Sequence, residues 1–333
     1  MPLQLAVIAA RKFAAREDER HERLVLYDCD AGRILRSFPL ELPDASAAAA
    51  FPVLATMTPD GSRVAAAVRH SEQRGVVVAW DAATGADLIR REAPAGALAI
   101  APDATFVATG DDDGRISVWS LPEGERFAEL RAGGNRITSL AFQRNPRRAE
   151  LDDPQSVRDP WLIAAGDSGG TVTVWNPTAG VPVSFCRGAH HQVTAVEFSP
   201  DATLVAGGAH AEVRLWDVAT GRLLLRIDPN ESGTGKPLQW ISGLAFSPDG
   251  TRLAITSLKR WSPPTVTVLQ LENGRGIRTL RGLSGEPSKI RFSADDRFIA
   301  GFSHRWEIGG SSPWESTGRS GPPGRKSAST RLS

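Results

Sequence analysis

The sequence predicts an all-β chain in which one small antiparallel sheet recurs along the whole length. Short runs of alternating apolar residues are each closed by Pro, Asp, Gly or Thr, the pattern of strands joined by tight hairpins. Residues 192–227 show this best, as QVTAVEFSPDATLVAGGAHAEVRLWDVATGRLLLRI, with four such runs. A single four-stranded sheet of this size cannot bury its own face, so the sheet is expected to repeat.

The turns and strand ends of that segment do repeat. The turn after the first strand recurs as Pro-Asp-Gly or a close variant, at residues 59–61, 102–104, 200–202, 248–250 and 294–296. The third strands end at Trp80, Trp119, Trp175 and Trp216. In the compact repeats these tryptophans lie about 40 residues apart, the period of a four-stranded propeller blade. The sequence therefore predicts a β-propeller with core tryptophans.

The segments AFSPDGTRLA (245–254), VRLWDVATG (213–221) and ISVWS (116–120) resemble the WD-repeat β-propeller family. The resemblance covers roughly residues 3–305 and is closest to a bacterial-type member with degenerate repeats. The count of repeats predicts seven blade positions, of which the last is incomplete. The alternative is a closed ring of six blades, in which residues 288–293 pair with strand 5–10.

The repeats follow one another in order. The first has strands at 5–10, 23–28 and 33–39 and lacks the innermost strand. Full repeats follow at 51–93, 97–131, 135–188, 192–227 and 240–281, and the fourth carries a surface insertion at 144–160. The last supplies only its first two strands, which leaves an unpaired edge at 297–303. We therefore expect a propeller over residues 1–305 and a disordered Ser/Gly/Pro/Arg-rich tail over 306–333, as in a truncated or frame-shifted reading frame.

Composition narrows the class of partner and the compartment. The formal charge of +1 over 333 residues favours neither a specific nucleic acid nor an acidic surface. The apolar segment 3–10 follows no basic region and is too short to span a membrane, so it is expected to be a strand. Two cysteines in different repeats suit a reducing compartment. The prediction is a cytoplasmic protein with no membrane partner; its oligomeric state stays open.

No catalytic motif is visible, so we expect no catalytic, cofactor or metal residues. Asp111-Asp112-Asp113-Gly114 suggests calcium, but the spacing of an EF-hand is missing. In the family that the chain resembles, one aspartate of this turn holds the blade together. Asp113 matches that position, and Thr109 and Trp119 match two others of the same network.

A few residues are candidates for partner binding. His191 and His210 occupy positions that the resemblance places side by side, and two imidazoles bind zinc only with a further ligand. Trp240 precedes a first strand, and Trp261 lies in a loop between a second and a third strand; these two connections share one end of a propeller. Exposed aromatic and basic residues are typical interface anchors. The candidate set is Trp240, Trp261, Arg260, Lys259, Asn135, His191 and His210.

The function that we expect is a non-catalytic protein–protein interaction scaffold, which binds a protein or peptide on the loop face of the propeller. One alternative is a severed regulatory propeller of a larger enzyme such as a kinase, which the DNA flanking the reading frame would reveal. The other is a quinoprotein-like propeller dehydrogenase, although neither a secretion signal nor a cofactor site is apparent.

Overall fold

The computed structural model describes residues 5–11, 22–28, 33–40, 53–69, 75–93, 96–144, 161–210, 212–227, 240–259, 262–272, 276–280, 290–293, 296, 298–301 and 304–307. Every regular element in these residues is a strand. No helix among them is long and apolar enough to cross a membrane. The all-β prediction is confirmed.

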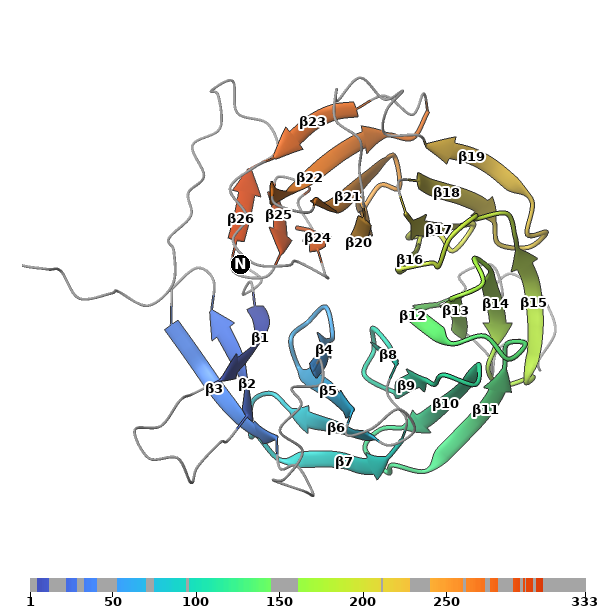
Figure 1. Ribbon diagram of the computed structural model, residues 1–333. Helices are drawn as coiled ribbons and strands as arrows, with labels where there is room; N and C mark the ends of the chain where they lie inside the picture. Colours follow the sequence, from blue (N-terminus) through green and yellow to red (C-terminus); the bar gives the residue numbers. More distant parts are fainter. Residues whose placement is uncertain are drawn as a thin grey trace, which may run out of the picture.

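The strands form small antiparallel sheets arranged around a ring (Figure 1). Five sheets have four strands each: β4 (Val53–Met57), β5 (Arg63–Arg69), β6 (Gly75–Asp81), β7 (Asp87–Glu92); β8 (Ala97–Ile100), β9 (Phe106–Gly110), β10 (Arg115–Ser120), β11 (Arg126–Arg131); β12 (Ile137–Arg144), β13 (Trp161–Asp167), β14 (Val172–Asn176), β15 (Val181–Cys186); β16 (Ala195–Phe198), β17 (Leu204–Ala209), β18 (Glu212–Asp217), β19 (Leu223–Ile227); β20 (Trp240–Phe246), β21 (Arg252–Lys259), β22 (Ser262–Gln270), β23 (Gly276–Leu280).

Two sheets have three described strands each, and they contain the two ends of the described chain: β1 (Leu5–Arg11), β2 (Glu22–Asp28), β3 (Arg33–Leu40); and β24 (Ile290–Phe292), β25 (Phe298–Gly301), β26 (His304–Glu307). In Figure 1 the first strand of each four-stranded sheet lies nearest the centre and the fourth strand lies at the rim. This is the arrangement of propeller blades.

The last sheet corrects one sequence-based expectation. We expected strands only at 290–293 and 298–302, with an unpaired edge, but β26 pairs with β25 from Phe298↔Glu307 to Gly301↔His304. The edge of β25 is therefore covered, and the expected propeller boundary at residue 305 falls inside β26. The sequence pattern missed this strand because it is four residues long and mostly polar. Almost all of the tail expected over 306–333 lies outside the described residues.

The pairing of β24 bears on the alternative ring. Ile290 pairs with Gly301 and Phe292 with Ile299, and in the described residues β1 pairs with β2 alone. This is the pairing expected for seven positions rather than for a six-bladed ring that uses residues 288–293 as a partner of β1. The number of blades itself stays a prediction.

Each first hairpin is closed by a small polar network. Ser247 Oγ donates to Asp249 Oδ1 at 2.5 Å and accepts a hydrogen bond from Arg252 N at 2.9 Å. Thr58 and Ser199 occupy the same place in their repeats. The residue after the Asp has a positive φ, +72° at Gly250, which glycine adopts without strain.

The Asp of each Trp-Asp pair closes the turn into the outer strand. Asp217 Oδ1 accepts hydrogen bonds from Thr220 N at 2.8 Å and from the Thr220 hydroxyl at 2.6 Å. Asp81 makes the same bonds to Thr84. A short polar side chain that accepts from the backbone two or three residues on favours a turn over a continuing strand.

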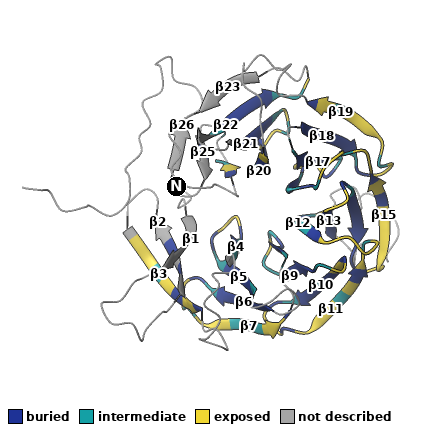
Figure 2. Ribbon diagram, in the orientation of Figure 1, coloured by how far each residue is buried: buried dark blue, intermediate teal, exposed yellow. Residues whose placement is uncertain are grey.

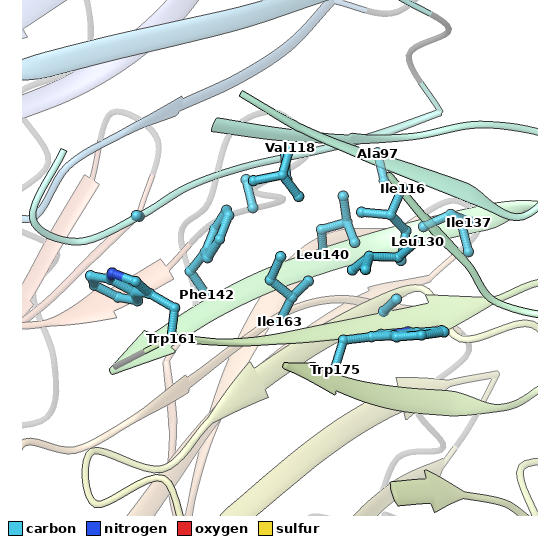
Figure 3. Packing of buried hydrophobic residues seen from close by; sticks show 14 residues of the cluster. Ala97, Ile116, Val118, Leu130, Ile137, Leu140, Phe142, Trp161, Ile163 and Trp175 are labelled. Atoms are coloured by element: carbon cyan, nitrogen blue, oxygen red, sulfur yellow. The ribbon is translucent and has the colours of Figure 1, made fainter. Parts of the chain in front are cut away.

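The core lies between neighbouring sheets. Figure 3 shows Ile116 and Val118 of one sheet packed against Leu140, Ile163 and Trp175 of the next. The rim strands carry most of the exposed residues (Figure 2). The tryptophans predicted as core are all buried, with at most 5% exposed: Trp80, Trp119, Trp175 and Trp216. Trp161, which begins β13, is also buried. Thr109 is buried as well, at 2%.

Candidate interaction surface on the loop face

One end of the ring consists of two kinds of connection: those that lead into each innermost strand, and the turns between second and third strands. Backbone hydrogen bonds join them across neighbouring sheets, from Ile137 N to Asp111 O at 2.8 Å and from Val193 N to Asp167 O at 3.0 Å. We call this end the loop face. Because these connections bond to each other, their backbones are held in place across neighbouring sheets.

Buried aspartates organise two of the turns on this face. Asp111 Oδ1 accepts hydrogen bonds from Asp113 N at 2.9 Å and Arg115 N at 2.7 Å, and Asp167 makes the equivalent bonds in the next repeat. We expected Asp113 to hold the blade, but it is exposed and Asp111 closes the turn instead. The carboxylate at the start of the turn reaches the amide groups inside it, whereas that of Asp113 does not.

Three of the candidate binding residues form one cluster. The ring centroids of His191 and His210 lie 5.2 Å apart, and those of His210 and Trp240 lie 5.0 Å apart at 90°. His191 leads into β16, His210 lies in the turn after β17, and Trp240 begins β20, so the cluster bridges two sheets. Trp240 is 50% exposed. The predicted proximity of the two histidines is therefore confirmed, and Trp240 extends the row.

A buried carboxylate holds the connection that carries His191. Glu212 Oε2 accepts hydrogen bonds from Arg214 Nη2 at 3.0 Å and Arg226 Nε at 3.1 Å, and Glu212 Oε1 accepts one from His190 N at 3.3 Å. Burial alone would raise the pKa of Glu212, but the hydrogen bonds from Arg214 and His190 outweigh it and lower the pKa. Glu212 is therefore ionised at neutral pH. Trp216 Nε1 adds a bond to Arg187 O at 3.1 Å.

Sequence reasoning missed the cluster of Glu212, Arg214 and Arg226. The signal was present: Glu212 and Arg214 alternate with apolar residues on the same face of β18 as buried Trp216. Both are buried, with side chains 6% and 7% exposed. Charged residues at buried positions are retained only with partners, so this pattern predicts an ion pair.

The remaining candidates divide between described and undescribed residues. Asn135 is exposed on the loop face, and its Nδ2 donates to Asp167 Oδ2 at 3.4 Å. Lys259 ends β21, pairing with Ser262, but its side chain lies outside the described residues. Arg260 and Trp261 lie wholly outside them. The structure thus joins three candidates, places Asn135 on the same face and leaves the rest of the set as predictions.

The described residues present neither a set of metal ligands nor a reactive thiol. In the part of the chain that the structure describes, no three His, Cys, Asp or Glu side chains are placed to hold a metal ion, so the histidine pair has no third ligand. Cys186 is a free, buried thiol. Burial raises its pKa to about 11, which keeps it protonated and unreactive at neutral pH.

A cavity of about 250 Å³ lies among the innermost strands, at the end away from the loop face. Its lining includes Pro59, Pro102 and Pro200 of the first-hairpin turns and the aromatic side chains of Phe142 and Phe198. The volume is below that of ordinary small-molecule pockets, about 300–1,000 Å³. It does not adjoin the aromatic cluster.

Four-stranded sheets arranged around a ring, with hydrogen-bonded connections at one end, define a β-propeller. The model of the WD domain, G-beta repeat, matches residues 92–120 and 180–217 of this chain. Together with the relatives below, this match supports a WD-repeat protein.

Three proteins show the extent of the sequence similarity. Apoptotic protease-activating factor 1 from Homo sapiens is 26% identical over 157 residues, covering 46% of this chain and 12% of that protein. Angio-associated migratory cell protein from Homo sapiens is 26% identical over 189 residues, with 56% and 37% covered. WD repeat-containing protein VIP3 from Arabidopsis thaliana is 27% identical over 144 residues, with 40% and 44% covered. The chain thus spans less than half the length of these relatives. All three are eukaryotic, so the expected bacterial type is unsupported.

Proposed function

We propose that this protein is a non-catalytic interaction scaffold that binds a protein or peptide partner on its loop face. The observation that carries the proposal is the row formed by His191, His210 and Trp240. WD repeats with WD-repeat relatives suggest a protein-interaction scaffold, and the row supplies a contact point for one.

The row has the properties of an interface anchor. An indole that is half exposed offers a large apolar surface with a polar tip, and such residues carry much of the binding energy in protein interfaces. Its position is fixed by packing against His210 and by its place in β20. A side chain that is already ordered loses little entropy on binding, so more of the contact energy appears as affinity.

Together with the function we propose a cytoplasmic location, which rests on the state of the described cysteine. Cys186 is a free, buried thiol, which suits a reducing compartment.

The proposal is tested by mapping contacts in cells. A photoreactive phenylalanine derivative placed at position 240 is expected to cross-link to a partner, whereas the same group at Leu224, 45% exposed on the rim, is the matched control. Trp240→Ala is expected to weaken binding of the recovered partner at least about tenfold, as for a hot-spot residue. Equal cross-linking at both positions, or unchanged affinity of Trp240→Ala, overturns the proposal.

A further inference from the structure

The cluster of charged side chains that holds the connection of His191 is unbalanced in charge. Glu212 is one carboxylate between two guanidinium groups, those of Arg214 and Arg226, so the three side chains together carry one excess positive charge. Arg214 Nε is buried and has no hydrogen-bond partner among the described residues. Arg226 is 54% exposed and donates to Glu212 through Nε, which leaves the end of its guanidinium toward solvent.

The surrounding connections add to this excess. Around the aromatic row, in the described residues 136, 167 to 171, 187 to 193, 208 to 214 and 226, four arginines face two carboxylates, and the aspartate turn at 111–113 lies one sheet further along the ring. Both carboxylates are already engaged, since Asp167 closes its turn and Glu212 holds the two guanidinium groups. Arg136 donates to the neutral amide of Gln192 at 3.1 Å. The imidazoles of His191 and His210 contribute hydrogen-bond donors but no negative charge.

Resting on the proposed function, we infer that the partner of this surface is an acidic peptide segment, in which an aromatic or long apolar side chain packs on Trp240 and a neighbouring Asp or Glu lies against Arg226 and the imidazoles. Glu212 connects the two parts, because it holds both Arg226 and the backbone of His190, next to His191. One carboxylate added here would neutralise the charge that Glu212 leaves over.

An acidic peptide fits better than a nucleic acid. Nucleic-acid binding relies on many cations that follow a phosphate backbone. Here the excess is confined to the connections of neighbouring sheets, and the whole chain carries only +1. A single exposed indole beside a local positive charge suits one apolar side chain with an acidic neighbour.

The inference is tested with a random peptide library displayed on phage and selected on the intact protein. We expect the peptides whose binding needs Trp240 to be enriched in Asp or Glu beside an aromatic or long apolar residue. Fluorescently labelled copies then give affinities for the wild type and for Arg226→Gln. We expect Arg226→Gln to lower affinity about tenfold and to reduce its dependence on salt.

Two controls keep the result interpretable. Arg126→Gln removes an arginine of similar exposure from the rim strand β11, where it pairs with Glu129, and is expected to leave affinity unchanged. Replacing the acidic residue of the peptide by Gln or Asn tests the same contact on unaltered protein, so a folding defect of Arg226→Gln cannot hide the outcome. Both changes are expected to weaken binding similarly, and the double change less than additively.

The outcomes separate the inference from the proposed function. If no selected peptide depends on Trp240, the proposed function fails and the inference with it. If Trp240-dependent peptides are basic or neutral, or if Arg226→Gln has no effect on them, only the inference fails. Binding of a single-stranded oligonucleotide that needs Trp240 and Arg226, with no peptide selected, also overturns it.

Discussion

At the scale of single residues, the tryptophans whose burial the structure describes fall into two environments that the sequence largely separates. A Trp at the end of a third strand is buried between sheets, whereas a Trp at the entry to a first strand lies on the loop face. Trp216 is 0% exposed and Trp240 50%. Stability and binding are therefore expected to depend on different members of one residue type.

Trp216→Ala is expected to lower the free energy of unfolding by about 3–5 kcal/mol, the range for large-to-small changes at a buried aromatic residue. Besides the cavity, the change leaves Arg187 O without the hydrogen bond from the indole. Denaturant unfolding measures the loss. Trp240→Ala is the control and is expected to cost less than about 1 kcal/mol, as exposed substitutions do; similar losses for both would mean that the burial described for Trp216 is wrong.

At the scale of elements, the first hairpins depend on an ionised aspartate. The side-chain hydrogen bond from Ser247, followed by the backbone bond from Thr251, lowers the pKa of Asp249 to about 2. In Asp201 burial raises the pKa, but hydrogen bonds from Ser199 and Thr203 outweigh it and lower the pKa. A carboxyl group whose pKa is lower in the folded state stabilises the fold when it is ionised.

The sign of the pH dependence follows. The contribution of Asp249 is fully present above its unfolded pKa of about 4 and is lost as the pH falls through the folded value of about 2. Asp249→Asn is therefore expected to be less stable than the wild type at pH 7, and the difference should shrink between pH 4 and pH 2. Urea unfolding across this range measures it.

Asp103→Asn is the matched control for the hairpin, because Ala101 stands where Ser247 donates its hydroxyl hydrogen bond. Asp103 keeps only the bonds from Thr105. We expect a smaller loss at pH 7 for this variant. A difference between Asp249→Asn and the wild type that stays constant down to pH 2 would contradict the assigned role of the carboxylate.

At the scale of the whole molecule, neighbouring sheets interlock in a repeated way. The second strands of three successive sheets have a glycine as their last or second-last residue, and this glycine receives a β-branched side chain from the next sheet: Gly110 with Ile137, Gly166 with Val193 and Gly208 with Ile241. Thr194 Oγ1 reinforces one of these joints by donating to Gly208 O at 3.1 Å and to Ile241 O at 2.5 Å. The joint is a close fit because no Cβ intervenes.

Gly208→Ala is expected to destabilise the protein by about 1–3 kcal/mol, as overpacking does. An added Cβ would collide with Cγ2 of Ile241, an atom that alanine lacks, so neither residue could remain in place. Combined with Ile241→Ala, the loss is expected to be smaller than the sum of the single losses, since the second change frees space at the joint. Thermal unfolding of all three variants measures the coupling, and strict additivity would exclude the interlock.

The parts that the sequence predicts are those set by local chemistry. The Pro-Asp turns, the Trp-Asp strand ends and the alternation of residues 213–216 identify the sheets without reference to distant residues. The proximity of His191 and His210 follows from their places in one repeat. The contact of His210 with Trp240 depends instead on how two sheets meet, and β26 is too short and polar to show a pattern. The role of Asp111 depends on which way a turn carboxylate points, which spacing alone does not specify.

The joints between a glycine of one sheet and a β-branched side chain of the next also bear on how such a chain evolves. Residues 137–166 and 193–208 each contain a side chain that fits the preceding sheet and a glycine that accepts the following one. A segment with both features is already compatible with a copy of itself on either side. Tandem duplication of the gene segment therefore adds a sheet that fits its neighbours from the start, while the loops between are left to diverge.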